Sequence, residues 1–260
     1  MTTPSIPVAE LRGGGRMPLL GFGTWQLRGR ECYDAVRAAL DSGYRHLDTA
    51  TMYRNEAEVG RALRDSCVSR DEVFVTTKLP PDRADRPEET IAASLDALGL
   101  ESVDLWLVHW PPGGPGVELW RRFLAARDAG QARDVGVSNY SLAQLDTLAE
   151  ETGEMPAVNQ IRWAPALHDA AVEEGHRERG VVLEGYSPLT STDLDDPVLR
   201  DVAGAHGATT AQVVLRWHLE HGIVVIPKSA DPGRIAANAA VTGFSLSPEE
   251  VGRIDALAGG

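Results

Sequence analysis

Short apolar segments alternate with helical patterns along most of the chain, and this alternation constrains the fold more than any other feature. Strands are expected at residues 19–23, 45–48, 73–78, 103–109, 134–137, 157–160, 181–185 and 223–226. Continuous apolar strands joined by helices indicate a parallel sheet covered by helices. Eight such units in a chain of 260 residues favour a closed (β/α)8 TIM barrel over an open, doubly wound sheet.

Turn and capping signals divide the chain further. Residues 6–18 are predicted to form a short N-terminal β-hairpin that turns at three consecutive glycines, Gly13 to Gly15. Ser141 fits the N-cap of a helix whose leucines recur every three residues. Helical patterns are expected over residues 30–41, 141–151 and 209–221. No linker or low-complexity segment interrupts the sequence, so we expect one barrel domain over residues 1–260.

Composition excludes several classes of function. The 25 basic and 38 acidic residues give a formal charge of −13, and no basic cluster suits a nucleic acid. No apolar run approaches a membrane span, and the first 20 residues lack the pattern of a signal peptide. Cys32 and Cys67 are expected to be reduced thiols. We therefore expect a cytoplasmic protein that works as a monomer. Its acidic faces, such as Glu56 and Glu58, are expected to be solvated surface.

Polar and aromatic side chains stand where the expected strands end. In a barrel of this kind, chemistry takes place at the C-terminal ends of the strands. We therefore expect a polar ligand or a reaction at this rim. The residues are Asp48, Tyr53, Lys78, His109, Trp110, Ser138, Asn139, Gln160, Tyr186, Ser187, Lys228 and Ser229.

Four of these side chains make chemical sense as a group. Tyr53 can donate a proton, and a neighbouring Lys78 cation would stabilise the phenolate that remains. Asp48 would hold that lysine charged and in place, and His109 could bind a substrate oxygen. The set suits proton donation to a carbonyl oxygen. The hydride for the carbonyl carbon must come from a cofactor, because no side chain supplies one.

An ordered series of motifs resembles the aldo-keto reductase family. They include Gly-Phe-Gly-Thr-Trp at 21–25, Gly-Tyr-Arg-His-Leu-Asp-Thr-Ala at 43–50, Leu-Val-His-Trp-Pro at 107–111, Gly-Val-Ser-Asn at 136–139 and Ile-Pro-Lys-Ser at 226–229. The chain is most similar to the compact prokaryotic branch that contains the diketogluconate reductases. The resemblance implies reduction of aldehydes or ketones with NADPH.

The resemblance also implies roles for single residues. Tyr53 would be the general acid, Lys78 and Asp48 its activators, and His109 the group that orients the substrate. The substrate pocket would be shaped by Trp25 and Trp110 together with Tyr53 and His109. No metal is expected. The cofactor would be bound by Thr24, Trp25, Asp48, Ser138, Asn139, Gln160, Tyr186, Ser187, Leu189, Lys228, Ser229, Arg234 and Asn238.

Three departures from the family pattern stand out. Ala237 occupies a position where an acidic residue usually helps to clasp the cofactor, so faster cofactor release is expected. The sequence ends at Gly260 without the longer tail that often closes the substrate pocket. Arg-Trp-Ala at 162–164 replaces the usual Glu-Tyr-His that follows Asn-Gln-Ile. In addition, Glu184 places an acidic residue at the end of the seventh strand, where a small or neutral residue is common. We expect Arg162 and Glu184 to form an ion pair at the barrel mouth, with two independent surface substitutions as the alternative.

Other functions fit less well. Residues 136–140 nearly spell a nucleophile elbow, but the final glycine is missing. Gly21 and Gly23 lack the third glycine of a dinucleotide fingerprint. His218 and His221 lie three apart with no third metal ligand nearby in sequence, so a solvated helix end is the simpler interpretation. A rival from another class is a cofactor-binding, redox-sensing subunit without turnover, which would be free to lose the four catalytic side chains.

Overall fold

The computed structural model describes residues 6–258. It begins with a hairpin in which β1 (Val8–Glu10) and β2 (Arg16–Pro18) pair antiparallel, as predicted. A sheet of eight parallel strands follows, in the spatial order β10-β9-β8-β7-β6-β5-β4-β3. Its strands are β3 (Phe22–Gly23), β4 (His46–Asp48), β5 (Phe74–Leu79), β6 (Val103–Val108), β7 (Ala132–Ser138), β8 (Val158–Arg162), β9 (Val182–Tyr186) and β10 (Val224–Val225).

The first and last strands of this sheet meet and close the barrel. Leu20 forms a parallel bridge with Val225. The amide of Gly21 donates to the Val225 carbonyl at 2.9 Å, and that of Gly23 donates to the Pro227 carbonyl at 3.0 Å. All eight predicted strands are present, and the predicted (β/α)8 barrel is confirmed.

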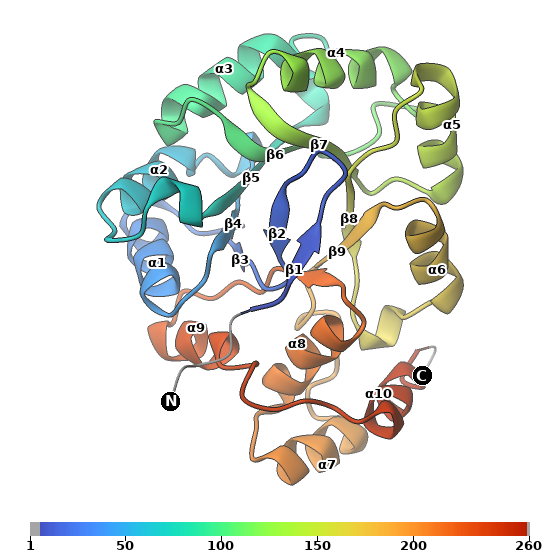
Figure 1. Ribbon diagram of the computed structural model, residues 1–260. Coiled ribbons are helices and arrows are strands. Elements are labelled where there is room, and N and C mark those ends of the chain that lie inside the picture. Colours follow the sequence, from blue (N-terminus) through green and yellow to red (C-terminus); the bar gives the residue numbers. More distant parts are fainter. Residues whose placement is uncertain (1–5, 259–260) are drawn as a thin grey trace.

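Helices surround the barrel as a ring, which Figure 1 shows from the hairpin side. Short η1 (Thr51–Tyr53), η2 (Arg70–Glu72), η3 (Pro81–Arg83) and η4 (Pro165–Leu167) lie in the connections. The α-helices are α1 (Gly29–Asp41), α2 (Glu56–Arg64), α3 (Pro87–Leu98), α4 (Val117–Asp128), α5 (Leu142–Thr152), α6 (Ala170–Glu178), α7 (Pro197–His206), α8 (Thr210–Glu220), α9 (Pro232–Ala239) and α10 (Pro248–Asp255).

Local sequence sets the helix boundaries that we predicted. Ser141 caps α5 and Thr209 caps α8, and in each case a glutamine three residues later completes a capping box. The helix predicted over residues 30–41 is α1, and it ends at Ser42. The capping side chains of Ser141 and Thr209 accept hydrogen bonds from backbone amides that have no partner within the first turn of the helix.

The hairpin lies across the end of the barrel where the strands begin (Figure 1). The Asp134 carboxylate, at the start of β7, accepts from the amides of Gly13 at 2.8 Å and Gly15 at 3.1 Å. A Cβ atom on Gly13 would lie 2.1 Å from an Asp134 oxygen, so the turn requires glycine here. Since this end is closed, the open end of the barrel is the one where the strands finish.

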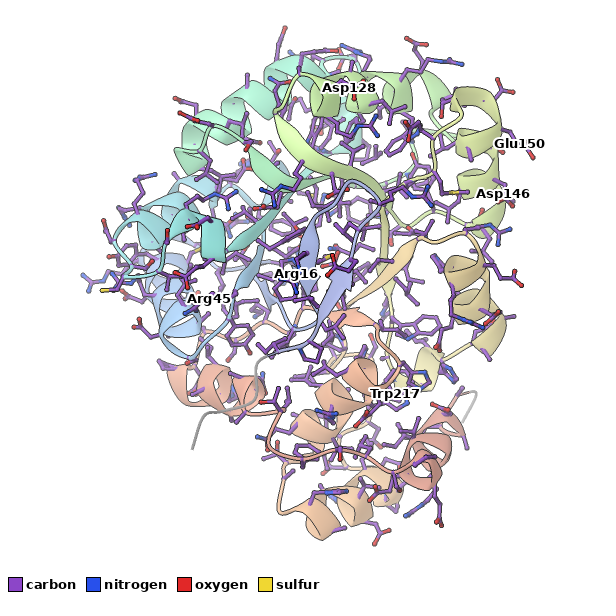
Figure 2. The ribbon with its side chains drawn as sticks, in the orientation of Figure 1. Arg16, Arg45, Asp128, Asp146, Glu150 and Trp217 are labelled. Atoms are coloured by element: carbon purple, nitrogen blue, oxygen red, sulfur yellow. The ribbon has the colours of Figure 1, made fainter. Side chains whose placement is uncertain are left out.

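Apolar side chains fill the space between barrel and helices, and most charged ones face outward. Figure 2 shows Asp128, Asp146 and Glu150 on the outer faces of α4 and α5. Trp217 in α8 is fully buried in a smaller apolar cluster, separate from the main core. There it packs with Trp163 and with residues of α7 and α10. No helix among residues 6–258 is both long and apolar enough to span a membrane.

Two surface expectations were wrong. Glu56 is buried rather than solvated, and its carboxylate accepts hydrogen bonds from Thr77 Oγ1 at 2.6 Å and Ser94 Oγ at 3.2 Å. His218 is fully buried rather than at a solvated helix end, with Nδ1 2.8 Å from the Val214 carbonyl oxygen. Cys32 is buried, Cys67 is exposed, and both are free thiols.

Candidate active site

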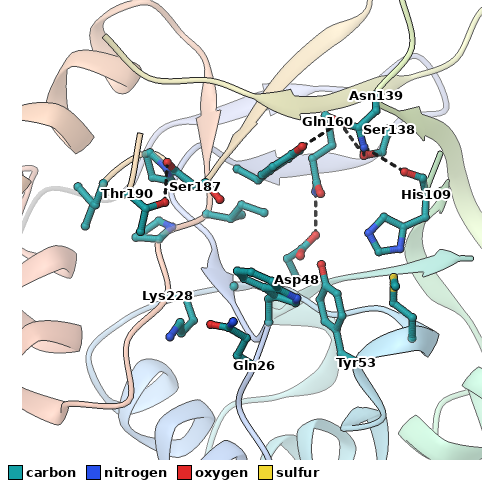
Figure 3. Close-up of a pocket in the computed structure, with 18 of the residues that line it drawn as sticks. Gln26, Asp48, Tyr53, His109, Ser138, Asn139, Gln160, Ser187, Thr190 and Lys228 are labelled. Carbon is teal, nitrogen blue, oxygen red and sulfur yellow. Dashed lines mark hydrogen bonds between the residues drawn. The ribbon is translucent and has the colours of Figure 1, made fainter. Parts of the chain in front are cut away.

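A cavity of about 410 Å³ opens where the barrel strands finish (Figure 3). It contains most of the side chains that the sequence predicted for the site. Those that line it are Trp25, Asp48, Tyr53, His109, Trp110, Ser138, Asn139, Gln160, Tyr186, Ser187, Leu189 and Lys228.

A buried ion pair forms the floor of the cavity. Lys78 Nζ donates to Asp48 Oδ1 at 2.6 Å and to the Thr49 carbonyl at 2.8 Å. Gln160 Nε2 donates to the second Asp48 oxygen at 2.9 Å. Burial alone would lower the pKa of Lys78, but Asp48 reverses this effect and the pKa lies above its ordinary value. The predicted role of Asp48, holding the lysine charged and in place, therefore matches the geometry.

Tyr53 stands above this pair. It ends the short helix η1, and Lys78 Nζ lies 5.2 Å from the centre of its ring. Burial raises the pKa of Tyr53, and the charge of Lys78 opposes that rise without overcoming it. The phenol therefore keeps its proton at neutral pH, with a cation nearby to stabilise the phenolate.

His109 faces Tyr53 across the cavity. The two ring centres lie 5.8 Å apart, and the imidazole stacks on Trp110 at 4.1 Å. Burial, with a second contribution from Lys78, lowers the pKa of His109 to about 2. The imidazole is therefore neutral and can bind a polar substrate oxygen without adding a charge.

Hydrogen-bonded polar side chains make up the wall formed by β7, β8 and β9. Ser138 Oγ donates to the Gln160 carbonyl at 2.8 Å, and Asn139 Nδ2 donates to the His109 carbonyl at 3.1 Å. Tyr186 Oη donates to Asn139 Oδ1 at 2.9 Å. Asn139 and Ser187 have φ of +63° and +58°, a conformation that costs energy for side-chain-bearing residues and is found mainly at functional sites.

An apolar rim surrounds the entrance. Trp25, Met52 and Trp110 are 54%, 46% and 38% exposed, which is unusual for large apolar side chains that touch a cavity. Such an exposed patch marks a binding surface. Trp25 and Trp110 were predicted here. Sequence reasoning missed Met52, Gln26 and Thr190, which also line the cavity, because loop residues of these types carry no distinctive signal.

Lys228 is exposed at the edge of the cavity, and the remaining residues predicted to bind the cofactor lie outside its wall. Ser229 continues the chain toward α9. Arg234 is exposed in α9 and its Nε donates to Ser229 Oγ at 3.3 Å, while Asn238 is buried. Thr24 is also buried, with its hydroxyl donating to the Asp48 carbonyl at 3.0 Å. The hydroxyl of Thr24 is thus used to position Asp48.

The predicted ion pair between Arg162 and Glu184 is wrong. Residue pairing between β8 and β9 places Gln160 beside Glu184 and Arg162 beside Tyr186. Arg162 is exposed and its Nε donates to Ser191 Oγ at 2.8 Å. Glu184 lies two residues deeper and is fully buried, so the alternative of two surface substitutions is wrong as well.

Glu184 is instead a buried carboxyl group near the ion pair of Asp48 and Lys78. Its Oε1 lies 3.8 Å from His46 Nε2, and neither of its oxygens has a hydrogen-bond partner among residues 6–258. Burial, and secondly the charge of Asp48, raise the pKa of Glu184 to about 8. Burial likewise lowers the pKa of His46 to about 3. Both groups are therefore neutral at pH 7.

Comparison with known proteins agrees with this geometry. The model of the Aldo/keto reductase family matches residues 19–258. The chain is 46% identical to 2,5-diketo-D-gluconic acid reductase B of Corynebacterium sp. (strain SHS752001), covering 98% of this chain and 94% of that protein. It is 40% identical to methylglyoxal reductase DkgA of Escherichia coli (strain K12), covering 99% and 94%.

Solved structures agree as well. An aldo/keto reductase from Brucella melitensis superposes with a TM-score of 0.93 at 38% identity, covering 97% of this chain and 100% of that one. A Bombyx mori aldo-keto reductase in complex with NADP gives 0.91 at 31% identity, covering 98% and 94%.

Proposed function

This chain belongs to the aldo/keto reductase family, and from that premise we propose that it reduces an aldehyde or ketone to the alcohol with NADPH. The observation that carries the proposal is the arrangement of Asp48, Tyr53 and His109 around one cavity, with the buried Lys78 bound to Asp48. A cofactor-binding subunit without turnover would have no need of this arrangement.

The polar wall and the cationic edge of the cavity fit a phosphorylated nicotinamide cofactor. Asn139, Ser138 and Gln160 offer amide and hydroxyl groups to a carboxamide, and Tyr186 offers an aromatic face. Lys228 and Arg234 place two exposed cations beyond them, where an adenosine 2′-phosphate would be bound through charge-assisted hydrogen bonds. Reduced nicotinamide supplies hydride chemistry when it is bound.

The side chains of this protein supply the rest of the reaction. Tyr53 donates its phenolic proton to the carbonyl oxygen while the carbon accepts hydride, so the product is the alcohol. Lys78 stabilises the resulting phenolate, and Asp48 fixes the lysine through the 2.6 Å ion pair. Neutral His109 binds the same substrate oxygen and orients it. The apolar rim of Trp25, Met52 and Trp110 limits the access of water to the substrate.

The test is NADPH oxidation, followed by the loss of nicotinamide absorbance, with a panel of carbonyl compounds. The panel contains simple aldehydes and ketones, methylglyoxal, and 2,5-diketo-D-gluconate, since relatives carry the names of reductases for the last two. We expect saturable turnover of at least one compound and a preference for NADPH over NADH. Tight NADPH binding with no turnover of any compound would favour the redox-sensing alternative.

The proposal also concerns the domain organisation, cellular location and oligomeric state of the protein. We propose that the chain is one barrel domain that works as a cytoplasmic monomer. Light scattering coupled to size-exclusion chromatography measures the mass directly, and we expect the 28.0 kDa of a single chain. A mass of twice this value would contradict the monomer.

A further inference from the structure

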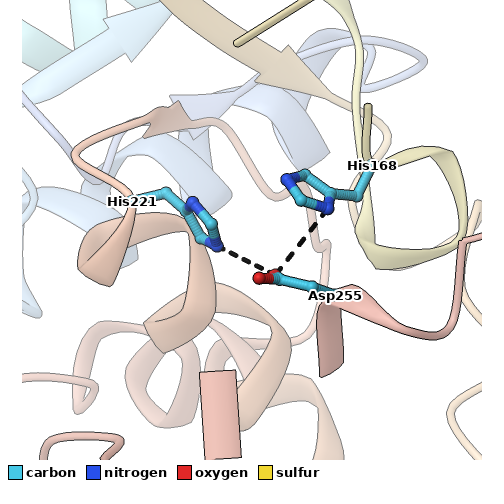
Figure 4. A group of neighbouring side chains, drawn as sticks. All are labelled: His168, His221 and Asp255. Carbon is cyan, nitrogen blue, oxygen red and sulfur yellow. Dashed lines mark hydrogen bonds and ion pairs between the residues drawn. The ribbon is translucent and has the colours of Figure 1, made fainter. Parts of the chain in front are cut away.

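Four titratable side chains from three separate segments of the chain meet outside the barrel. His168 follows η4, Glu173 lies in the first turn of α6, His221 follows α8, and Asp255 ends α10. Figure 4 shows His168, His221 and Asp255 turned toward one another. None of the four lines the 410 Å³ cavity, so the proposed reductase activity does not account for them.

The two imidazoles point one nitrogen each at the same carboxylate oxygen. His221 Nε2 lies 3.0 Å and His168 Nδ1 lies 3.8 Å from Asp255 Oδ1. One ligand atom from each of the three residues lies within 4.8 Å of the others. In a tetrahedral zinc site with bonds of about 2.0–2.1 Å, ligand atoms are roughly 3.4 Å apart. The two distances to Asp255 bracket that value.

The other nitrogen of each imidazole meets a second carboxylate. His221 Nδ1 lies 3.0 Å and His168 Nε2 lies 3.3 Å from Glu173 Oε2. A histidine that binds a metal usually donates its second N–H to a carboxylate, which fixes the tautomer and the ring orientation. Glu173 is placed to do this for both histidines at once. In addition, Trp217 Nε1 donates to Asp255 Oδ1 at 2.7 Å and orients that carboxylate.

The charge balance favours a cation. Glu173 and Asp255 form ion pairs with the two histidines, and no lysine or arginine among residues 6–258 pairs with either of them. The two carboxylates carry a charge of −2 and, against the effect of burial, raise the pKa of His221, so either a proton or a bound metal cation can balance them. Trp163 and Trp217 contact His168 edge-on and provide an apolar surround, and all four polar side chains remain 11–28% exposed, so an ion has access from solvent.

From this arrangement we propose that His168, His221 and Asp255 bind a divalent transition-metal ion, with zinc the best fit, and that Glu173 supports both histidine ligands. Two imidazoles and one carboxylate suit Zn²⁺, and water would complete the tetrahedron. The ion joins the loop after β8 to the ends of α8 and α10. By bridging these segments the ion holds the C-terminal helix against the barrel.

The test uses untagged protein freed of metal by a chelator and titrated with ZnCl₂ in a calorimeter. We expect one saturable site per chain and a higher melting temperature with zinc. We also expect CoCl₂ to give the intense visible absorption of tetrahedral cobalt. This measurement on the native protein depends on no variant. If the native protein showed neither saturable zinc binding nor tetrahedral cobalt absorption, the proposal would be overturned. The four side chains would then be held together by their hydrogen bonds and ion pairs alone.

Variants locate the site. His168→Ala, His221→Gln and Asp255→Asn should each abolish saturable zinc binding, and Glu173→Gln should weaken it by about 10–100-fold. The matched control is His206→Gln, which removes a histidine paired with Glu250 but not part of this group. The control should bind zinc as the native protein does. If all three ligand variants bound zinc with native affinity, the ion would lie elsewhere and the assignment would be wrong.

Discussion

The two ends of the proposed active site are built in opposite ways. At the catalytic end the side chains of Lys78 and Asp48 are 0% and 2% exposed, and each is bound by other parts of the barrel. At the outer end Lys228 and Arg234 are exposed, and within residues 6–258 the Arg234 guanidinium makes a single hydrogen bond, of 3.3 Å, to Ser229. The catalytic end is thus organised before any ligand arrives, whereas the outer end has cations left to bind one.

This difference leads to different expectations for substitutions. A change at the catalytic end should affect stability and rate together, because the same contacts that position the reacting groups also satisfy buried charges. A change at the outer end should affect cofactor affinity and leave the free energy of unfolding almost unaltered, since exposed charges contribute little to it.

The largest effect is expected for Lys78→Met. This change leaves the Asp48 carboxylate buried without its cation, which should cost about 3–5 kcal/mol of stability in urea unfolding. Turnover should also fall below detection, because Tyr53 loses the charge that stabilises its phenolate.

The double variant Asp48→Asn, Lys78→Met provides the control. It removes both charges, so it should regain most of the stability and none of the activity. If the single variant were as stable as the native protein, the catalytic end would not be the tightly paired region described here.

Glu184 offers a pH-dependent test of the same end. Its pKa of about 8 in the folded protein exceeds the ordinary value of about 4.3 in the unfolded chain. Between these two pH values the folded state holds a proton on Glu184 that the unfolded chain has released. The contribution of this group to the stability of the fold is therefore complete below about pH 4.3 and is lost as the pH rises through 8. Because Glu184→Gln stays neutral, its stability relative to the native protein should rise with pH across this window, by at most about 1.4 kcal/mol per pH unit.

Urea unfolding at several pH values measures this difference. Glu118→Gln serves as the control, because the Glu118 side chain is 82% exposed, and its stability difference from the native protein should stay nearly constant. A constant difference for Glu184→Gln as well would mean that Glu184 is ionised in the folded state.

A smaller effect is expected at the outer end. Arg234→Ala removes an exposed cation proposed to bind the 2′-phosphate, so the ratio of kcat/KM for NADPH to that for NADH should fall by about tenfold. The urea midpoint should not change. Arg253→Ala, which removes an exposed arginine paired with Asp201, is the matched control and should keep the native ratio. An unaltered ratio for Arg234→Ala would remove this residue from the cofactor site.

The smallest effect concerns cofactor release. Ala237 is partly buried in α9, where the family resemblance implies an acidic residue that clasps the cofactor. Ala237→Glu restores a hydrogen-bond acceptor, and one added hydrogen bond should slow NADP⁺ release by about 2–10-fold. Stopped-flow fluorescence measures release, and Ala237→Gln separates charge from length. Equal release rates for the native protein and Ala237→Glu would show that the missing carboxylate has no consequence.

The sequence predicted the barrel and most of its rim because both depend on local patterns. Strand ends carry Asp48, Lys78 and His109 in an order that the parallel sheet converts directly into proximity. How far a side chain lies below the rim of the barrel could not be predicted in the same way. Arg162 and Glu184 were placed at one level, but the strand register separates them by two residues, so Arg162 is exposed at the end of β8 while Glu184 is buried in β9.

Groups assembled from distant segments could not be predicted from the sequence. His221 was considered as a metal ligand together with His218 and set aside because no third ligand lies nearby in sequence. His168 and Asp255 lie 53 and 34 residues away from His221 along the chain. Glu56 looks like any surface acid on an amphipathic helix, and only the packing of α2 against β5 and α3 shows that Thr77 and Ser94 bind it.

The central claim, that Tyr53 donates the proton in a carbonyl reduction, is tested most directly by Tyr53→Phe. Single-turnover oxidation of bound NADPH by a carbonyl compound that the native protein reduces should slow by about 10²–10⁴-fold, because a general acid is removed. The affinity for NADPH, measured by fluorescence titration, should stay within a few-fold of native, since the ring remains. A Tyr53→Phe protein that oxidises NADPH at the native rate would contradict the account.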